Sequence, residues 1–111
     1  SNNVASGYQT LHSNTTGNSN SAYGKRALFS NTTGSNNAAV GDGALQNNVT
    51  GSSNSAVGKN ALKSNTNWNN TAVGYDTLTS NTSGTSNSAL GRDALHRRFQ
   101  CCNWTPSIES K

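Results

Sequence analysis

Six Asn-x-Ser/Thr sequons are the residues of this chain whose type and spacing most directly suggest chemistry. In a eukaryotic secreted protein, the side-chain amide of such an asparagine accepts an N-linked glycan. Four of the sequons lie seven residues after a recurring glycine, which predicts a row of glycans pointing outward from one edge of a regular structure. Turns rich in Asn and Thr also produce this motif by chance, and in a bacterial or phage protein it has no such meaning. The candidate glycosylation sites are Asn14, Asn31, Asn48, Asn69, Asn81 and Asn103.

The acidic and histidine residues do not form a catalytic set. Asp76 and Asp93 share an offset within the repeat and would stack ~4.8 Å apart. A hard cation is usually bound by about six oxygen ligands, more than these two carboxylates supply. His12 and His96 share another offset but are five repeats apart, so they cannot meet within one chain. The sequence contains no Ser-His-Asp set, phosphate-binding loop or zinc signature. We therefore expect no enzyme activity, no cofactor and no metal site.

Cys101 and Cys102 are adjacent and lie outside the repeats. Their spacing matches neither a zinc site nor a redox motif. A disulfide between the two neighbours would be strained, because their Cα atoms are only ~3.8 Å apart. Two interpretations remain: two free thiols in a tail, or a disulfide between chains.

The composition alone resembles that of a disordered linker. Asn, Ser and Thr supply 49 of the 111 residues, only 30% of the residues are hydrophobic, and 11% are charged. The apolar residues nevertheless recur in a fixed phase, which a disordered linker has no reason to keep. The net charge of +4 includes no dense basic patch, which argues against nucleic-acid binding. No window of ~18 apolar residues is present, so we expect no membrane insertion.

A recurring glycine reveals internal repeats. The intervals between successive glycines are 17, 17, 17, 16 and 17 residues. Counted from each glycine, the second residue before it is always Ala, the fourth before it is always Asn and the fourth after it is always Leu. The repeat reads N-S-A-V-G-x-x-A-L-x-S-N-T-T-G-S-x. The glycines are Gly7, Gly24, Gly41, Gly58, Gly74 and Gly91.

This unit is too short and too rich in turn residues for a two-helix repeat. The segment S-A-V-G predicts one short strand, A-L-x-S predicts a second, and the remaining residues are typical of turns. One coil per repeat predicts an all-β fold, a parallel β-solenoid or β-roll of six coils with a ~17-residue repeat. The solenoid is expected over residues 1–98, followed by a non-repeat tail over residues 99–111.

The columns of identical residues predict how the coils pack. We expect the Leu and Val columns to form apolar ladders inside the coil and the Asn columns to form amide ladders. Ala and Val are adjacent in the strand, so they point to opposite faces. The invariance of Ala then suggests that the second face is covered too, most simply by another copy of the chain. Ala56 is therefore expected in a packed contact, and the thin core suggests an oligomer.

One repeat is a residue shorter than the others. Trp68 falls there at the offset that is glycine in four other repeats, namely Gly17, Gly34, Gly51 and Gly84. We expect a local kink with an exposed indole there. Alternatively, Trp68 and the three tyrosines could form a surface on which sugars stack.

Three of the units resemble repeats of known surface proteins: N-S-A-V-G-K-N-A-L, N-T-A-V-G-Y-D-T-L and N-S-A-L-G-R-D-A-L. They look like repeats in the heads of trimeric autotransporter adhesins. They are also similar to repeats in phage and virus tail fibres and in large secreted surface proteins of aquatic microbes. The resemblance covers residues 2–98, although the adhesin repeats are shorter and lack the N-T-T-G-S-x loop. It implies a left-handed parallel β-roll, usually trimeric, with binding or shaft roles.

These observations favour a structural protein, a component of an extracellular or virion fibre or filament built from stacked coils. The alternative is an adhesin or receptor-binding head that recognises glycans or surfaces. A third hypothesis, ice binding, is weak because the Thr column is interrupted by Val49 and lies in a turn. The expected partners are copies of the same chain or filament neighbours, and glycans either attached or bound. The expected location is extracellular, at a cell surface or on a virion.

Overall fold

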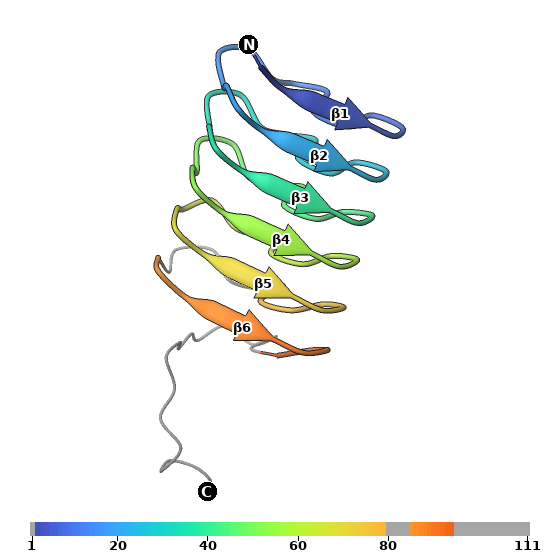
Figure 1. The fold of residues 1–111 in the computed structure, drawn as a ribbon, viewed down its shortest axis with the longest axis vertical. Helices are drawn as coiled ribbons and strands as arrows, with labels where there is room; N and C mark the ends of the chain where they lie inside the picture. Colours follow the sequence, from blue (N-terminus) through green and yellow to red (C-terminus); the bar gives the residue numbers. More distant parts are fainter. Residues whose placement is uncertain (1, 80–84, 95–111) are drawn as a thin grey trace, which may run out of the picture.

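The computed structural model describes residues 2–79 and 85–94, which form an all-β parallel β-solenoid (Figure 1). Each repeat contributes one three-residue strand, and the strands pair in chain order in one six-stranded parallel sheet. The fold class predicted from the glycine interval is therefore confirmed. The strands are β1 (Val4–Ser6), β2 (Ser21–Tyr23), β3 (Ala38–Val40), β4 (Ser55–Val57), β5 (Thr71–Val73) and β6 (Ser88–Leu90).

The register of the sheet places equivalent residues of successive repeats side by side. Ala39 pairs with Ala56, and Ala56 pairs with Ala72 although only 16 residues separate them. The shortened repeat therefore keeps the strand register, and the turn before β5 absorbs the missing residue. Because the Ala, Leu and first Asn columns each contain one residue type, the preference of these positions for the interior is repeated along the rod.

Although Trp68 has the sequence offset of the glycine, it does not take the structural place of that glycine in the shortened repeat. The carbonyl of Asn67 accepts hydrogen bonds from Asn54 Nδ2 (2.7 Å) and Asn65 Nδ2 (2.8 Å). The carbonyl of Gly51 accepts the equivalent pair of bonds in the preceding coil. Asn67 thus occupies the glycine position, because the backbone closes the turn one residue earlier. Trp68 follows it and is 49% exposed, as the predicted exposed indole requires.

The strand turns its Ala inward and its Val outward, which reverses our expectation for the two columns. Ala39 and Ala56 are fully buried, whereas Val40 and Val57 are each 42% exposed. Ala56 is packed as predicted, but inside its own coil and not between chains. The chain after each glycine folds directly behind the strand, so the inward side chains meet the Ala and Leu residues of that segment. Close approach of the two segments leaves room for a methyl group and not for a Val side chain.

The A-L-x-S segment is not a second strand, so this prediction is also wrong. We call residues 25–31 and their equivalents the back segment, and in the described part of the chain it consists of successive turns. Leu28 has φ +53°, and the turn bond from Ala27 N to Gly24 O is 3.1 Å long. The Leu28 N–H still donates to the Ala44 carbonyl of the next coil at 3.0 Å. A left-handed Leu costs about 1–2 kcal/mol, which the ~1.5–3 kcal/mol from burying its side chain offsets.

The recurring glycines directly follow the strands, at the point where the chain leaves the sheet. Gly41 has φ +129°, in a region that L side chains rarely adopt. A Cβ atom added there would lie 2.6 Å from the carbonyl oxygen of Gly58 in the next coil. Glycine is needed at this column because the coils approach each other closely at this corner.

Candidate functional site

The outward side chains of the sheet form two columns that together we call the sheet face. The column at the start of the strands has mostly small side chains, and we call it the small column. The column at the end of the strands has mostly large apolar side chains, and we call it the bulky column. The small column contains Ser21, Ala38, Ser55, Thr71 and Ser88, and the bulky column contains Tyr23, Val40, Val57, Val73 and Leu90. The first strand reverses this order, with Val4 and Ser6.

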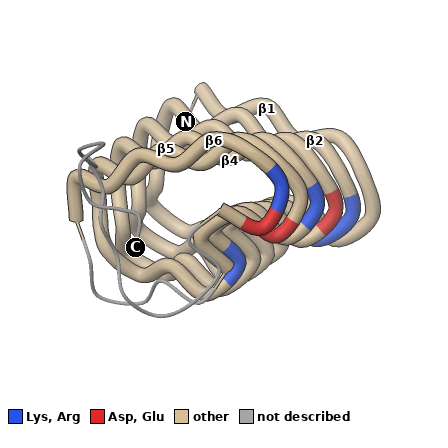
Figure 2. The backbone as a smooth tube through the Cα atoms, turned by 90° about the horizontal axis from the view of Figure 1, so that it is seen from below, with Lys and Arg blue, Asp and Glu red and all other residues tan. Residues whose placement is uncertain are grey.

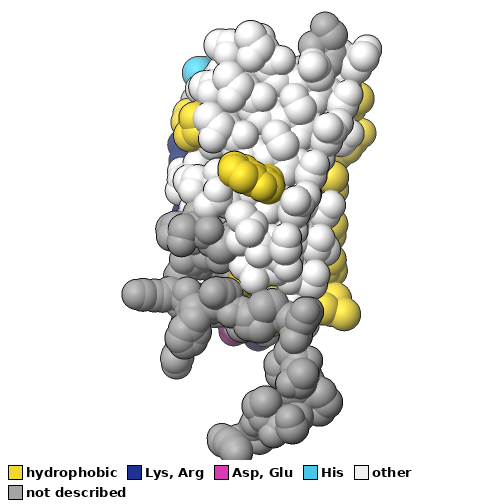
Figure 3. Space-filling model, turned by 90° about the vertical axis from the view of Figure 1, so that its left-hand side faces the viewer, with side chains coloured by type: hydrophobic (Ala, Val, Ile, Leu, Met, Phe, Trp, Pro, Cys, Tyr) yellow, Lys and Arg dark blue, Asp and Glu magenta, His cyan; other side chains and the backbone are white. Residues whose placement is uncertain are grey.

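The bulky column is a continuous apolar stripe that is exposed to solvent. The exposed fractions of its side chains range from 37% for Val73 to 78% for Leu90. In Figure 3 these hydrophobic side chains line one side of the rod, whereas the turn face toward the viewer is mostly polar. Single exposed apolar residues are normal on a protein surface, but a contiguous patch marks an interaction site. The sheet face is therefore the candidate functional surface.

Sequence reasoning missed this surface, although a signal for it was available. The inward column accepts only Ala, whereas the outward column contains Ser, Tyr, Val and Leu. Side chains of such different volumes cannot share one tightly packed interior column. Variation in size at this position pointed to the exposed face, and the invariance of Ala pointed to the interior.

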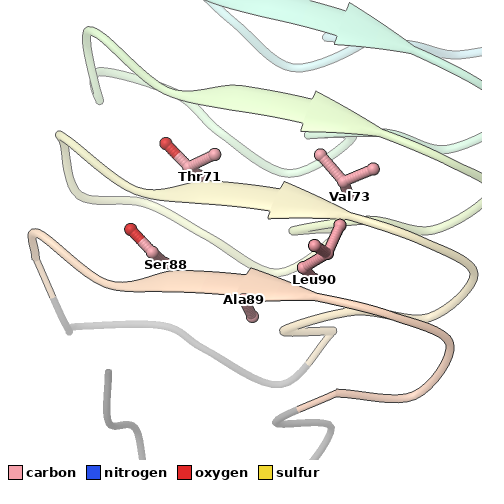
Figure 4. A pocket seen from close by; sticks show the side chains of 5 residues that line it. All are labelled: Thr71, Val73, Ser88, Ala89 and Leu90. Carbon is pink, nitrogen blue, oxygen red and sulfur yellow. The ribbon is translucent and has the colours of Figure 1, made fainter. Parts of the chain in front are cut away.

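A shallow hollow lies on the sheet face over β5 and β6 (Figure 4). It has a volume of about 340 Å³ and is lined by Thr71, Val73, Ser88, Ala89 and Leu90. The two hydroxyl residues lie on one side of the hollow and the two large apolar residues on the other. The lining has no charged group, so it suits contact with an apolar surface better than acid–base chemistry.

The charged side chains of the described residues lie away from the sheet face. Figure 2 shows that the charged residues belong to the turns that follow the strands and to the back segment. Asp76 Oδ1 accepts a hydrogen bond from Asn60 Nδ2 at 3.1 Å. Arg92 lies over the ring of Tyr75 at 5.2 Å and approaches the Asp93 carboxylate at 3.8 Å. Asp76 and Asp93 thus each have a different polar neighbour. Nowhere in residues 2–79 and 85–94 do three His, Cys, Asp or Glu residues gather as metal ligands.

The Asn column before the strands forms a buried ladder inside the coil. The Asn54 N–H donates to Asn37 Oδ1, and the Asn37 N–H donates to Asn20 Oδ1, both at 2.9 Å. Asn37 Nδ2 donates to the Gly51 carbonyl, also at 2.9 Å. Each of these amides therefore satisfies a backbone donor of the next coil and a carbonyl of the turn that leads into that coil. The predicted amide ladder exists, and it satisfies backbone groups that water cannot reach.

The Asn column at the end of the back segment forms a second ladder, which contradicts the outward orientation expected of the sequon row. Asn31 and Asn48 are fully buried. Asn48 Nδ2 donates to Asn31 Oδ1 at 3.1 Å and to the Gly51 carbonyl at 2.9 Å. Both amide hydrogens are thus used, and a glycan on this nitrogen would displace one of them. The half-buried Asn14 accepts the bond from Asn31 Nδ2 at 2.8 Å.

Asn69 differs from these residues because it is exposed at the turn before β5. It follows the exposed Trp68 and begins the sequon that ends at Thr71, the first residue of β5. A glycan attached to Asn69 would not disrupt the buried ladder. At the other sequons that the structure describes, a glycan would displace a ladder hydrogen bond. Asn81, Asn103, Cys101 and Cys102 lie outside the described residues, as do His96 and the tail at 99–111.

The exposed aromatic residues within the described part of the chain do not form one sugar-stacking surface. Tyr8 and Tyr75 share a column but are four repeats apart, which corresponds to about 19 Å along the rod. Trp68 lies in the turn before a strand, and Tyr23 lies on the sheet face. His12 stacks on Phe29 with 5.2 Å between ring centroids.

The described residues include no helix that is long and apolar enough to cross a membrane. No protein-family model, curated protein or solved structure matches this chain. Its function must therefore be argued from the geometry of the rod and its sheet face.

Proposed function

We propose that this chain is a structural segment of an extracellular or virion fibre or filament, in which solenoid rods associate side by side. The observation that carries the proposal is the exposed apolar stripe. It lies on a rod in which the buried Asn side chains hydrogen-bond to the backbone and to one another. A stripe of this kind is costly for an isolated rod and useful for one that has lateral neighbours.

Hydrogen bonding along the rod supports a mechanical role. Backbone bonds join successive coils at the strand, at the turn after the strand and at the back segment. Examples are Gly41 N to Tyr23 O (2.8 Å), Gly43 N to Lys25 O (2.9 Å) and Leu45 N to Ala61 O (3.0 Å). The Asn ladders add further bonds in the same direction. A load along the axis would be shared by all the bonds between two coils, so a stack of coils suits a shaft.

The resemblance of the repeat units to those of surface proteins and tail fibres is the support for an extracellular or virion location. The separation of the exposed aromatic residues favours a shaft over a glycan-binding head. The proposed partners are therefore other copies of the chain, and glycan recognition remains the alternative that the experiment must address.

Electron microscopy of the native, unproteolysed protein tests the proposal. We expect long filaments, and X-ray diffraction from aligned filaments should show a ~4.8 Å reflection along the fibre axis because the coils stack in that direction. A compact oligomer that binds a glycan array would contradict the fibre proposal and favour the adhesin alternative.

A further inference from the structure

We infer that the sheet face binds the sheet face of a second copy of this chain, with the two rods side by side and pointing in the same direction. The inference rests on the proposed function, because it names the lateral contact that a fibre of such rods would use. Two properties of the sheet face carry it: its lack of charge and the difference in height between its two columns. Its area determines how tightly the two copies bind.

The distribution of charge favours a second copy over a charged partner. The two columns of the sheet face contain Ser, Thr, Ala, Val, Tyr and Leu, and no charged residue. Lys25, Asp42 and Lys59 each come two residues after the end of a strand. Figure 2 shows charged residues in the turns beyond the strand ends. An acidic peptide or a nucleic acid would find no complementary charge on the face. Each copy has a net charge of +4, but two copies that meet through this uncharged face do not place like charges against each other in the contact.

The relief of the sheet face favours one orientation of the second copy. Around a two-fold axis parallel to the rods, the bulky column of each copy lies over the small column of the other. Val57 then faces Ser55 of the second copy in the same coil, and Val73 faces its Thr71. A two-fold axis along the strands would place bulky columns against each other and leave a gap between small columns. Packed surfaces require side chains that fill the space between them, so the first arrangement is the better fit.

The area of the sheet face sets the strength of this contact. Six strands spaced ~4.8 Å apart and three residues long cover about 290 Å² per copy. A stable dimer usually buries about 800 Å² per partner. We therefore expect the 111-residue chain to associate weakly, with a dissociation constant in about the millimolar range. A longer array of coils would associate more tightly, because each coil adds about 50 Å² of face.

Sedimentation equilibrium of the full chain at concentrations up to ~1 mM tests the surface. Cys101 and Cys102 are replaced by Ser in every sample so that disulfides do not contribute. We expect the average mass of this reference protein to rise with concentration and that of Val57→Lys to stay at the monomer value. Thr50→Lys adds the same charge at an exposed turn and should associate like the reference. A reference protein that stays monomeric at ~1 mM, or a Val57→Lys variant that associates like Thr50→Lys, would overturn the inference.

A neutral variant guards against a folding defect in Val57→Lys. Combined replacement of Val40, Val57 and Val73 by Ser removes the apolar stripe without adding charge, and circular dichroism checks that both variants keep the fold. If the folded Ser variant associates as strongly as the reference protein, the bulky column is not the contact.

Thiol cross-linking tests the orientation. A mixture of the Ser55→Cys and Val57→Cys variants should cross-link with a short bismaleimide much faster than Val57→Cys alone. The reverse result would refute the proposed orientation. Microscopy separates this inference from the fibre proposal. Filaments that persist in the Val57→Lys variant would support the fibre role and overturn the sheet-face contact. Dimers of a protein that never forms filaments would support the sheet-face contact and overturn the fibre role.

Discussion

Replacement of Asn37 by Ala tests how much the buried amide ladder stabilises the solenoid. The fully buried Asn37 makes two side-chain bonds: Oδ1 accepts from Asn54 N–H, and Nδ2 donates to the Gly51 carbonyl. The Gly51 carbonyl keeps a bond from Asn48 Nδ2 at 2.9 Å, so its loss is partial. The N–H of the buried Asn54 loses the bond from its neighbouring coil.

The magnitude follows from these two losses. Leaving a buried N–H unsatisfied costs about 1–3 kcal/mol, and losing one of two bonds at a carbonyl costs about 1 kcal/mol. We expect Asn37→Ala to lower the free energy of unfolding by ~2–4 kcal/mol. The matched control is Asn47→Ala, because Asn47 is exposed at a turn, and we expect a change within about 0.5 kcal/mol.

Urea denaturation followed by circular dichroism measures the two free energies of unfolding. Hydrogen exchange measured by NMR adds a local readout, since the Asn54 N–H should be protected in the unmodified chain and exchange faster in Asn37→Ala. Equal stabilities of the Asn37→Ala and Asn47→Ala variants, together with an unchanged exchange rate at Asn54, would refute the claim that the ladder stabilises the fold.

Three further predictions concern the glycine corner, the inward Ala column and the sequons. Gly41→Ala should lower the free energy of unfolding by at least ~2 kcal/mol, because φ is +129° and the new Cβ would lie 2.6 Å from Gly58 O; an unchanged urea midpoint would contradict this. Ala56→Leu should cost ~1–3 kcal/mol by overpacking the coil interior, and a melting temperature equal to that of the unmodified chain would argue against a tight interior. When the chain is secreted from eukaryotic cells, glycopeptide mass spectrometry should find a glycan at Asn69 and none at Asn48; glycan at Asn48 in folded protein would refute the buried ladder.

Much of the fold could be predicted from the sequence because a regular repeat converts local choices into columns. The interval of 17 residues and the short S-A-V-G segment were sufficient for a parallel β-solenoid. The Leu column was correctly placed in the interior, since Leu28 and Leu45 are fully buried. The positive φ of Gly41 and the amide ladder through Asn37 also followed from residue type at a repeated position.

Residue type at a repeated position did not determine whether the sequon asparagines point into the coil or out to solvent. An Asn in a turn can face water or satisfy backbone groups inside, and both outcomes agree with turn propensity. The decision depends on whether a carbonyl and another amide lie within hydrogen-bonding distance, as Gly51 O and Asn31 Oδ1 do for Asn48. Gly51 is only three residues from Asn48, but Asn31 is 17 residues away, so only the closed coil brings all three residues together.

The sequence by itself determined the period, the parallel stacking and the fact that Ala and Val point to opposite faces of each strand. Only the tertiary structure decided which of the two faces is inside. The back segment of left-handed turns passes so close behind the strand that the interior accepts the methyl group of Ala56 and turns the larger Val57 outward. Strand alternation alone does not determine which face points inward. The width of the coil determines it, and that width depends on the whole path of the back segment.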